Sequence, residues 1–235
     1  MPLQHLENAP LIEAVFELRF PGEPIVLTSL DRYYEVIRRD LPEVWVPNAQ
    51  PGVAPALQPW EFKNKDGSRW IGVSINTFAA HVRDYKDYAD FRSWALPLAE
   101  SFCGAFQIKD LTRVGARYRN RILLLRTPGE PIPLARYLKI GFELPALIDV
   151  STMEDIHLQF ATRRGDAQIV IVLHHVRESA GQPEGLVLDL DCGVVDNVSA
   201  ARLGEHFDAV HTCTEDLFAA LASEGYMRFM KGETV

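Results

Sequence analysis

Apolar and polar residues alternate along several short segments of this chain, and this alternation constrains the fold more than any other feature of the sequence. The clearest case is the segment 13–20. Its apolar members on one face of an extended chain are Ala14, Phe16, Leu18 and Phe20, and the other face carries Glu13, Glu17 and Arg19 together with Val15. Period-two alternation is typical of a strand with one buried face, so this segment predicts a strand within a sheet.

A first β-hairpin is predicted over residues 60–63 and 70–78. The two segments flank Asp66-Gly67, a dipeptide that favours a two-residue turn between antiparallel strands. A turn at this place puts Phe62 on the same face as Val73, so the apolar residues of both segments meet on one side of the hairpin.

A second hairpin is predicted over residues 155–162 and 167–177, around Gly165. A two-residue loop again aligns the apolar residues of the two segments, and it puts Phe160 on the same face as Ile171. We expect the phenylalanines of both hairpins to be buried.

Other segments carry apolar residues at helical spacing. The predicted helices cover residues 29–39, 88–104, 134–140 and 200–221, and Asp87 is placed to cap the second of them. Further strands are predicted over 112–125 and 186–192. The proline-rich stretch 42–59 predicts a crossover along the surface.

The order of these elements is nearly the same in both halves of the chain. Each half begins with a strand, continues with a helix and a hairpin, and ends with a helix, and the second half has one more strand before its last helix. This order predicts an α+β fold, with mainly antiparallel sheet and helices packed on one face. It also suggests a duplicated βαββα-type unit. We divide the chain into a first αβ half, residues 1–110, and a second αβ half, residues 111–235. The sequence leaves open whether they form one continuous domain, and one sheet or two.

Composition excludes several classes of protein. The chain of 235 residues is 47% hydrophobic, as folded domains are, and its net charge of -8 argues against non-specific binding to nucleic acid. It has no run of the roughly 18 apolar residues that a membrane span requires. The cysteines are far apart in the sequence and indicate reduced thiols: Cys103, Cys192 and Cys213. We therefore expect a cytoplasmic protein without a cofactor.

Two segments carry a resemblance to a known family. Residues 8–20 read NAPLIEAVFELRF, and residues 113–122 read RVGARYRNRI. They resemble the APIVEAVFEIRF-like N-terminal strand and the RIGLRYINRI-like central strand of a sporadically distributed bacterial family of uncharacterised proteins. The last predicted helix, with His211 upstream of Phe218, is also similar, so the resemblance spans nearly the whole chain. The sporadic distribution implies an accessory role in a mobile or defence-related bacterial system.

The most unusual local feature is a row of arginines on one face of the strand predicted over 112–125. The row consists of Arg113, Arg117, Arg119 and Arg121. At about 3.3 Å per residue, it extends over about 26 Å of sheet surface. Guanidinium groups bind the oxygens of carboxylates and phosphates, so the row predicts a surface for an anionic ligand or a protein partner. The alternative is a structural role, in which the arginines pair across strands with Glu13 and Glu17.

A second polar group lies in the C-terminal half. The hairpin places His174 opposite Asp155 or His157, and Asp189 and Asp191 share one face of the next strand. Histidine with carboxylates can bind a divalent metal or perform acid–base catalysis. His174, Asp189 and Asp191 are therefore an alternative metal site, although their spacing matches no known signature.

The sequence contains no dinucleotide-binding, P-loop, nucleophile-elbow or kinase motif. We therefore predict a non-enzymatic binding or interaction protein whose partner, an unknown protein or anionic ligand, binds the arginine row. The alternative is a hydrolase or metal-dependent enzyme that uses the histidine and aspartate group. Whether the protein is a monomer or a homodimer remains open at this point.

Overall fold

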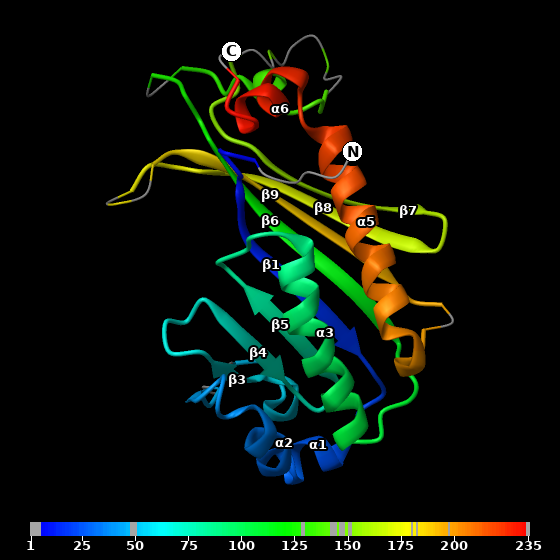
Figure 1. The fold of residues 1–235 in the computed structure, drawn as a ribbon. Coiled ribbons are helices and arrows are strands. Elements are labelled where there is room, and N and C mark those ends of the chain that lie inside the picture. The colour runs from blue at the N-terminus through cyan, green and yellow to red at the C-terminus, as the bar shows by residue number, and fades with distance from the viewer. Residues whose placement is uncertain are drawn as a thin grey trace.

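A computed structural model of the chain shows one large antiparallel sheet (Figure 1). The structure describes residues 6–47, 51–127, 130–141, 145, 149, 152–179, 181, 183–196 and 198–233. The described residues form nine strands in the order β2-β3-β4-β5-β1-β6-β9-β8-β7. The strands of the first half are β1 (Leu11–Arg19), β2 (Glu43–Trp45), β3 (Trp60–Lys63), β4 (Arg69–Val73) and β5 (Thr77–Val82). Those of the second half are β6 (Arg113–Leu123), β7 (His157–Arg164), β8 (Ala167–Val176) and β9 (Gly185–Val194).

The long helices pack on one face of this sheet (Figure 1). The helices are α1 (Pro24–Thr28), α2 (Leu30–Ile37), α3 (Tyr88–Ala105), α4 (Leu134–Tyr137), α5 (Leu203–Leu221) and α6 (Glu224–Met230). Short 3-10 turns occur at Pro55–Leu57 and at Ala200–Arg202, directly before α5. The side chain of Asp87 accepts a hydrogen bond from the backbone N–H of Asp90 and caps α3. The predicted α+β class, with antiparallel sheet and helices on one face, is confirmed.

Strands of both halves belong to this one sheet, and they meet where β1 pairs with β6. Each half runs from a central strand through short helices to a meander of antiparallel strands and then to a long helix. Phe16 of β1 stacks on Phe207 of α5, with 3.7 Å between ring centroids, so the first strand packs against the last long helix. The common order agrees with a duplicated unit, but the duplication itself stays a prediction.

The first hairpin has the predicted register, because Phe62 lies opposite Ile71 and only 2% of it is exposed. Its second strand was predicted to continue to Phe78, which is wrong. β4 ends at Val73, and the chain reverses over 74–77 before β5 begins. The Ser74 hydroxyl lies 2.7 Å from the Thr77 hydroxyl, and the Ser74 N–H donates to the Thr77 carbonyl. These short-range bonds form a turn without the glycine or proline that sequence patterns rely on.

The second hairpin also has a predicted register, with His157 opposite His174 and Phe160 opposite Ile171. The expected burial of Phe160 is wrong, however, because 42% of this residue is exposed. β7 is the edge strand of the sheet, and α5 packs on β6 and β9. Phe160 is on the face of the sheet that carries the helices, as predicted, but it lies at the edge of the sheet, beyond the strands that α5 covers.

The two hairpin phenylalanines provide a test of this description. Phe62→Ala removes a ring from the core and should lower the free energy of unfolding by about 3–5 kcal/mol. Phe160→Ala should lower it by less than about 1 kcal/mol, because water already reaches its ring. Urea unfolding followed by circular dichroism measures both values. An equal loss of unfolding free energy in the two variants would contradict the different burial of the two phenylalanines.

Candidate functional site: the open face of the sheet

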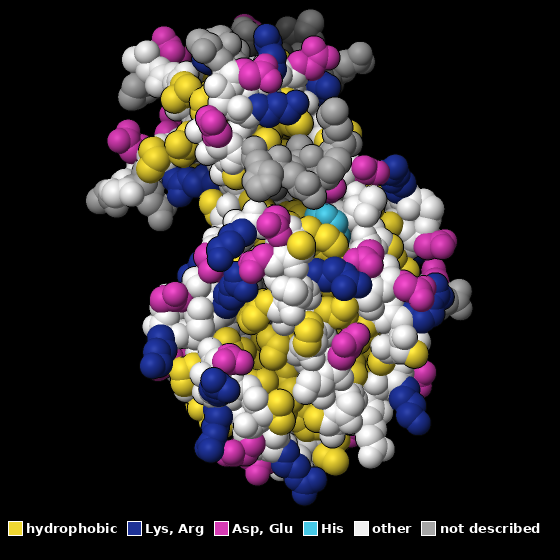
Figure 2. Space-filling view, in the orientation of Figure 1, with side chains coloured by type: hydrophobic (Ala, Val, Ile, Leu, Met, Phe, Trp, Pro, Cys, Tyr) yellow, Lys and Arg dark blue, Asp and Glu magenta, His cyan; other side chains and the backbone are white. Residues whose placement is uncertain are grey.

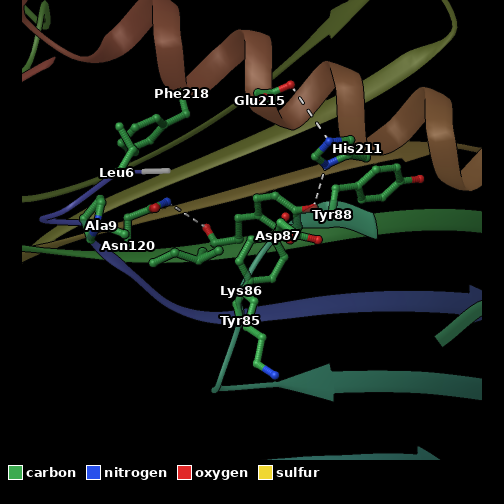
Figure 3. Close-up of a pocket in the computed structure, with 13 residues that line it drawn as sticks. Leu6, Ala9, Tyr85, Lys86, Asp87, Tyr88, Asn120, His211, Glu215 and Phe218 are labelled. Atoms are coloured by element: carbon green, nitrogen blue, oxygen red, sulfur yellow. Dashed lines mark hydrogen bonds and ion pairs between the residues drawn. The ribbon is translucent and has the colours of Figure 1, made fainter. Parts of the chain in front are cut away.

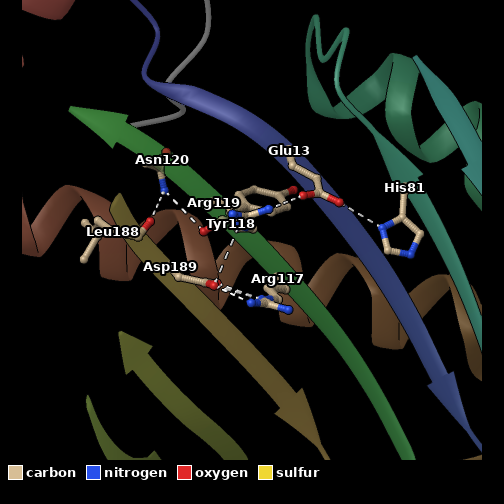
Figure 4. A network of polar contacts seen from close by, with 8 residues as sticks. All are labelled: Glu13, His81, Arg117, Tyr118, Arg119, Asn120, Leu188 and Asp189. Carbon is tan, nitrogen blue, oxygen red and sulfur yellow. Dashed lines mark hydrogen bonds and ion pairs between the residues drawn. The ribbon is translucent and has the colours of Figure 1, made fainter. Parts of the chain in front are cut away.

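The face of the sheet opposite α3 and α5 carries the polar side chains of the central strands (Figure 4). We call it the open face. Its central residues are Glu13, Val15, Glu17 and Arg19 of β1, the predicted arginine row and Gly115 of β6, and Asp189, Asp191 and Gly193 of β9. The strand alternation determines this placement, since Phe16, Ala116 and Leu190 point to the helices and are fully buried.

Arg117 forms a two-pronged ion pair with Asp189 of the neighbouring strand. Its Nε lies 2.9 Å from Oδ1 and its Nη2 lies 2.5 Å from Oδ2 of the carboxylate. Half of the arginine side chain, 52%, remains exposed, whereas only 8% of the aspartate side chain does. The carboxylate therefore lies beneath the guanidinium group and holds it in a fixed orientation at the surface.

Arg119 takes part in a similar arrangement on the other side of β6. Its Nη1 donates to Glu13 at 2.7 Å, and the second oxygen of Glu13 lies 3.1 Å from Nδ1 of His81 (Figure 4). Burial alone would raise the pKa of Glu13, but the hydrogen bonds from His81 and Arg119 outweigh it and lower the pKa to about 2. The carboxylate is thus ionised throughout the physiological pH range, with 11% of its side chain exposed against 37% for Arg119.

Arg113 lies flat on the sheet between two carboxylates. Its Nη1 donates to Glu17 at 2.9 Å and its Nη2 donates to Asp191 at 2.5 Å. A Cβ atom on Gly115 would lie 2.2 Å from this guanidinium group, and one on Gly193 would lie 2.5 Å from its Nε. An alanine at either position would therefore displace the Arg113 side chain from this path.

Arg121 differs from the other members of the row. Its Nη2 donates to the backbone carbonyl of Pro183 at 2.6 Å, near one end of β6. The structure thus contains elements of both interpretations of the row. Glu13 and Glu17 pair with Arg119 and Arg113, as the structural alternative predicts, while Arg117 and Arg119 keep large exposed fractions.

A shallow hollow of about 350 Å³ lies on this face beside the exposed arginines. Small residues of adjacent strands contribute to its lining: Val15, Gly72, Ala79 and Gly115. Its charged lining contains four arginines and four carboxylates: Arg19, Arg113, Arg117, Arg119, Glu13, Glu17, Glu61 and Asp191. The open face therefore offers the exposed guanidinium groups of Arg117 and Arg119 beside a shallow depression of mixed charge.

The histidine and aspartate group of the second half does not assemble into a metal site. Asp189 and Asp191 are held by Arg117 and Arg113, and His174 lies opposite His157 and Val187 on the adjoining strands. Asp155 accepts a hydrogen bond from Arg177 instead. Within the part of the chain that the structure describes, no group of three or more His, Cys, Asp or Glu side chains could hold a metal ion.

Sequence analysis did not identify Asp189 and Asp191 as partners of the arginines, nor His81 as a partner of Glu13. The sequence pattern does place Asp189 and Asp191 on the polar face of a predicted strand. Their contacts depend on β9 lying next to β6 and β5 lying next to β1, which is long-range information. A sign of the arrangement was Gly115, whose missing side chain leaves room for Arg113.

Comparisons with known proteins do not assign the chain to a family. No protein-family model matches it, and no curated protein matches it. The family resemblance of its β1 and β6 segments therefore stays a prediction. In the described ranges, no helix is long and apolar enough to cross a membrane.

A single substitution tests whether Gly115 leaves the room that the Arg113 side chain needs. Gly115→Ala should displace the guanidinium group from Glu17 and Asp191 and lower the free energy of unfolding by about 1.5–3 kcal/mol. Gly104→Ala is the matched control, because its added methyl group meets no atom within 4 Å in α3. It should stabilise the protein by up to about 1 kcal/mol, as alanine is the better helix former. Equal stability of the two variants in urea unfolding would contradict the described packing of Arg113.

Proposed function

We propose that the protein is a non-enzymatic binding protein and that its open face binds an acidic segment of a partner protein. The observation that carries this proposal is the layering of charges on the face. In two ion pairs the carboxylate lies beneath and the guanidinium group lies outside, Arg117 over Asp189 and Arg119 over Glu13. Arg113 shows the reverse order, because it is less exposed than its partners Glu17 and Asp191. A partner that approaches Arg117 and Arg119 meets donors of hydrogen bonds, so acidic side chains complement this part of the face best.

The buried carboxylates favour binding because they orient the arginines in advance. A free arginine side chain loses rotational freedom when a partner binds it, and this loss weakens the complex. Arg117 and Arg119 are already held by Asp189 and Glu13. Each guanidinium group has five N–H donors, more than one carboxylate can accept, so donors remain for a second carboxylate.

The dimensions of the face favour an extended polypeptide. An extended segment of about eight residues matches the 26 Å of sheet that the arginine row spans at about 3.3 Å per residue. The whole chain carries a net charge of -8, which repels acidic molecules in general. Binding of an acidic segment therefore requires a local surface such as this one.

The alternative function, a hydrolase or metal-dependent enzyme, receives less support from the same residues. Asp189 and Asp191 are ion-paired with arginines, which occupy carboxylate oxygens that a metal ion or a substrate would need. His174 lies two strands from β6 and has no carboxylate directly opposite it on either neighbouring strand.

A labelled octaglutamate peptide tests the proposal. We expect its binding, measured by fluorescence anisotropy at low salt, to weaken about tenfold or more when Arg117→Gln is combined with Asp189→Asn. This pair of substitutions removes both charges together, so neither partner is left as an unpaired buried ion. NMR titration of the unaltered protein should show shifts concentrated in β1, β6 and β9.

The matched control makes the same replacements at another ion pair. Arg177→Gln with Asp155→Asn removes an exposed pair away from the open face and should leave peptide affinity unchanged. Thermal unfolding of both variants verifies that they are folded. The proposal fails if the control weakens binding as much, or if octaglutamate binds elsewhere or not at all.

A further inference from the structure

A cavity of about 340 Å³ lies on the opposite side of the sheet, between the start of α3 and the middle of α5. Hydrophobic side chains reach the surface along the middle of this side of the molecule (Figure 2). The cavity is lined largely by rings and aliphatic groups, including Leu6, Leu11, Tyr85, Tyr88 and Phe218. Its volume and apolar walls are typical of sites for small molecules.

Asn120 supplies a hydrogen-bond acceptor in the wall of this cavity. It is the polar exception on the apolar face of β6, where Tyr118 and Ile122 are its buried neighbours, and only 4% of it is exposed. Its Nδ2 donates to the backbone carbonyls of Tyr118 and Leu188, at 3.4 and 3.3 Å, which determines the orientation of the amide (Figure 4). The Oδ1 atom has no hydrogen-bond partner among the residues that the structure describes. This acceptor is therefore available to a molecule that enters the cavity.

A tyrosine and a histidine form another polar edge of the cavity. The hydroxyl of Tyr118 lies 2.7 Å from Nδ1 of His211, and the imidazole stacks on Tyr88 at 3.6 Å (Figure 3). Burial raises the pKa of Tyr118 well above its ordinary value, so the hydroxyl keeps its proton, and the tautomer of His211 sets which of the two groups donates. Burial also lowers the pKa of His211, against the opposing effect of Glu215 and Asp208, and keeps the imidazole neutral.

The charges at the cavity are predominantly acidic. Glu215 lies 3.9 Å from Nε2 of His211, and Asp87 contributes a second carboxylate at the start of α3. Lys86 also lines the cavity, but its side chain extends away from Asn120 and His211 (Figure 3). With His211 neutral, the groups near Asn120 favour a positively charged molecule over an anion.

We propose that this cavity binds a small organic cation, an amidinium or ammonium group attached to a flat apolar body. The N–H donors of the cation would be accepted by Oδ1 of Asn120 and by the Glu215 carboxylate. The flat body would pack among Tyr85, Tyr88 and Phe218. The face of an electron-rich ring adds attraction for such a cation. This site is separated by the sheet from the open face, and neither proposal depends on the other.

Three probes of nearly the same shape distinguish the effect of ligand charge from that of ligand shape: benzamidinium, benzamide and benzoate. In NMR titrations of the whole chain, we expect affinity to fall in that order, with benzoate at least about tenfold weaker than benzamidinium. The shifts should include the backbone signals of Tyr88, Asn120 and His211. Equal affinity for benzoate, or benzamidinium shifts confined to other parts of the chain, would overturn the proposal.

Two variants test the named acceptors. Asn120→Leu is similar in shape and removes the acceptor, and it should weaken benzamidinium about tenfold or more while stability stays equal or rises. Glu215→Gln removes the negative charge without a change of size and should also lower the affinity for benzamidinium. This second variant keeps the test decisive if Asn120→Leu does not fold. Glu205→Gln, on the exposed part of the same helix, is the control and should leave affinity unchanged. Unaltered affinity in a folded Asn120→Leu variant would refute the assignment.

Discussion

The antiparallel pairing of β1 with β6 is the interaction on which the rest of the structure depends. It joins the two halves of the chain into one sheet, because β5 extends the sheet from one side of the pair and β9 from the other. The pairing also brings Glu13 and Glu17 next to Arg119 and Arg113, so the joint is held by ion pairs on one face. On the other face, Phe16 packs against Phe207 and extends the joint into the helix layer. Separation of the two strands would therefore also part this stacked ring pair and expose its apolar surface.

The period-two geometry of these strands gives the two faces different chemistry. Successive residues such as Ala116 and Arg117 point to opposite sides, so one strand supplies both the core and the charged surface. On the open face, water reaches Arg117 and Arg119 while their carboxylate partners are covered, and it reaches Glu17 and Asp191 while Arg113 is covered. One member of each pair thus stays hydrated, and this avoids the cost of burying a complete ion pair. On the helix face, Asn120 is an exception within an apolar surface, where its Nδ2 bonds two backbone carbonyls and its side chain lines the cavity between α3 and α5.

Much of the fold could be predicted from the sequence, because alternation and capping are local. The strands at both sides of the joint, and α3 with its cap Asp87, follow from such patterns. The turn at Ser74 contains neither glycine nor proline, so β5 was not recognised as a separate strand. The exposure of Phe160 depends on which strands α5 covers, and the pairing of Asp189 with Arg117 depends on strand order. Both are tertiary properties, which local patterns do not contain.

Native-state hydrogen exchange tests most directly whether the β1–β6 joint makes the two halves one unit. The account predicts that the slowest backbone amides of β1, β5, β6 and β9 share one opening free energy, equal to that of global unfolding. In a denaturant series, the opening free energies of all these amides should fall together. Two separate opening free energies, one for residues 11–105 and another for residues 113–230, would contradict the account, as would β1 and β6 amides that exchange before those of the flanking strands.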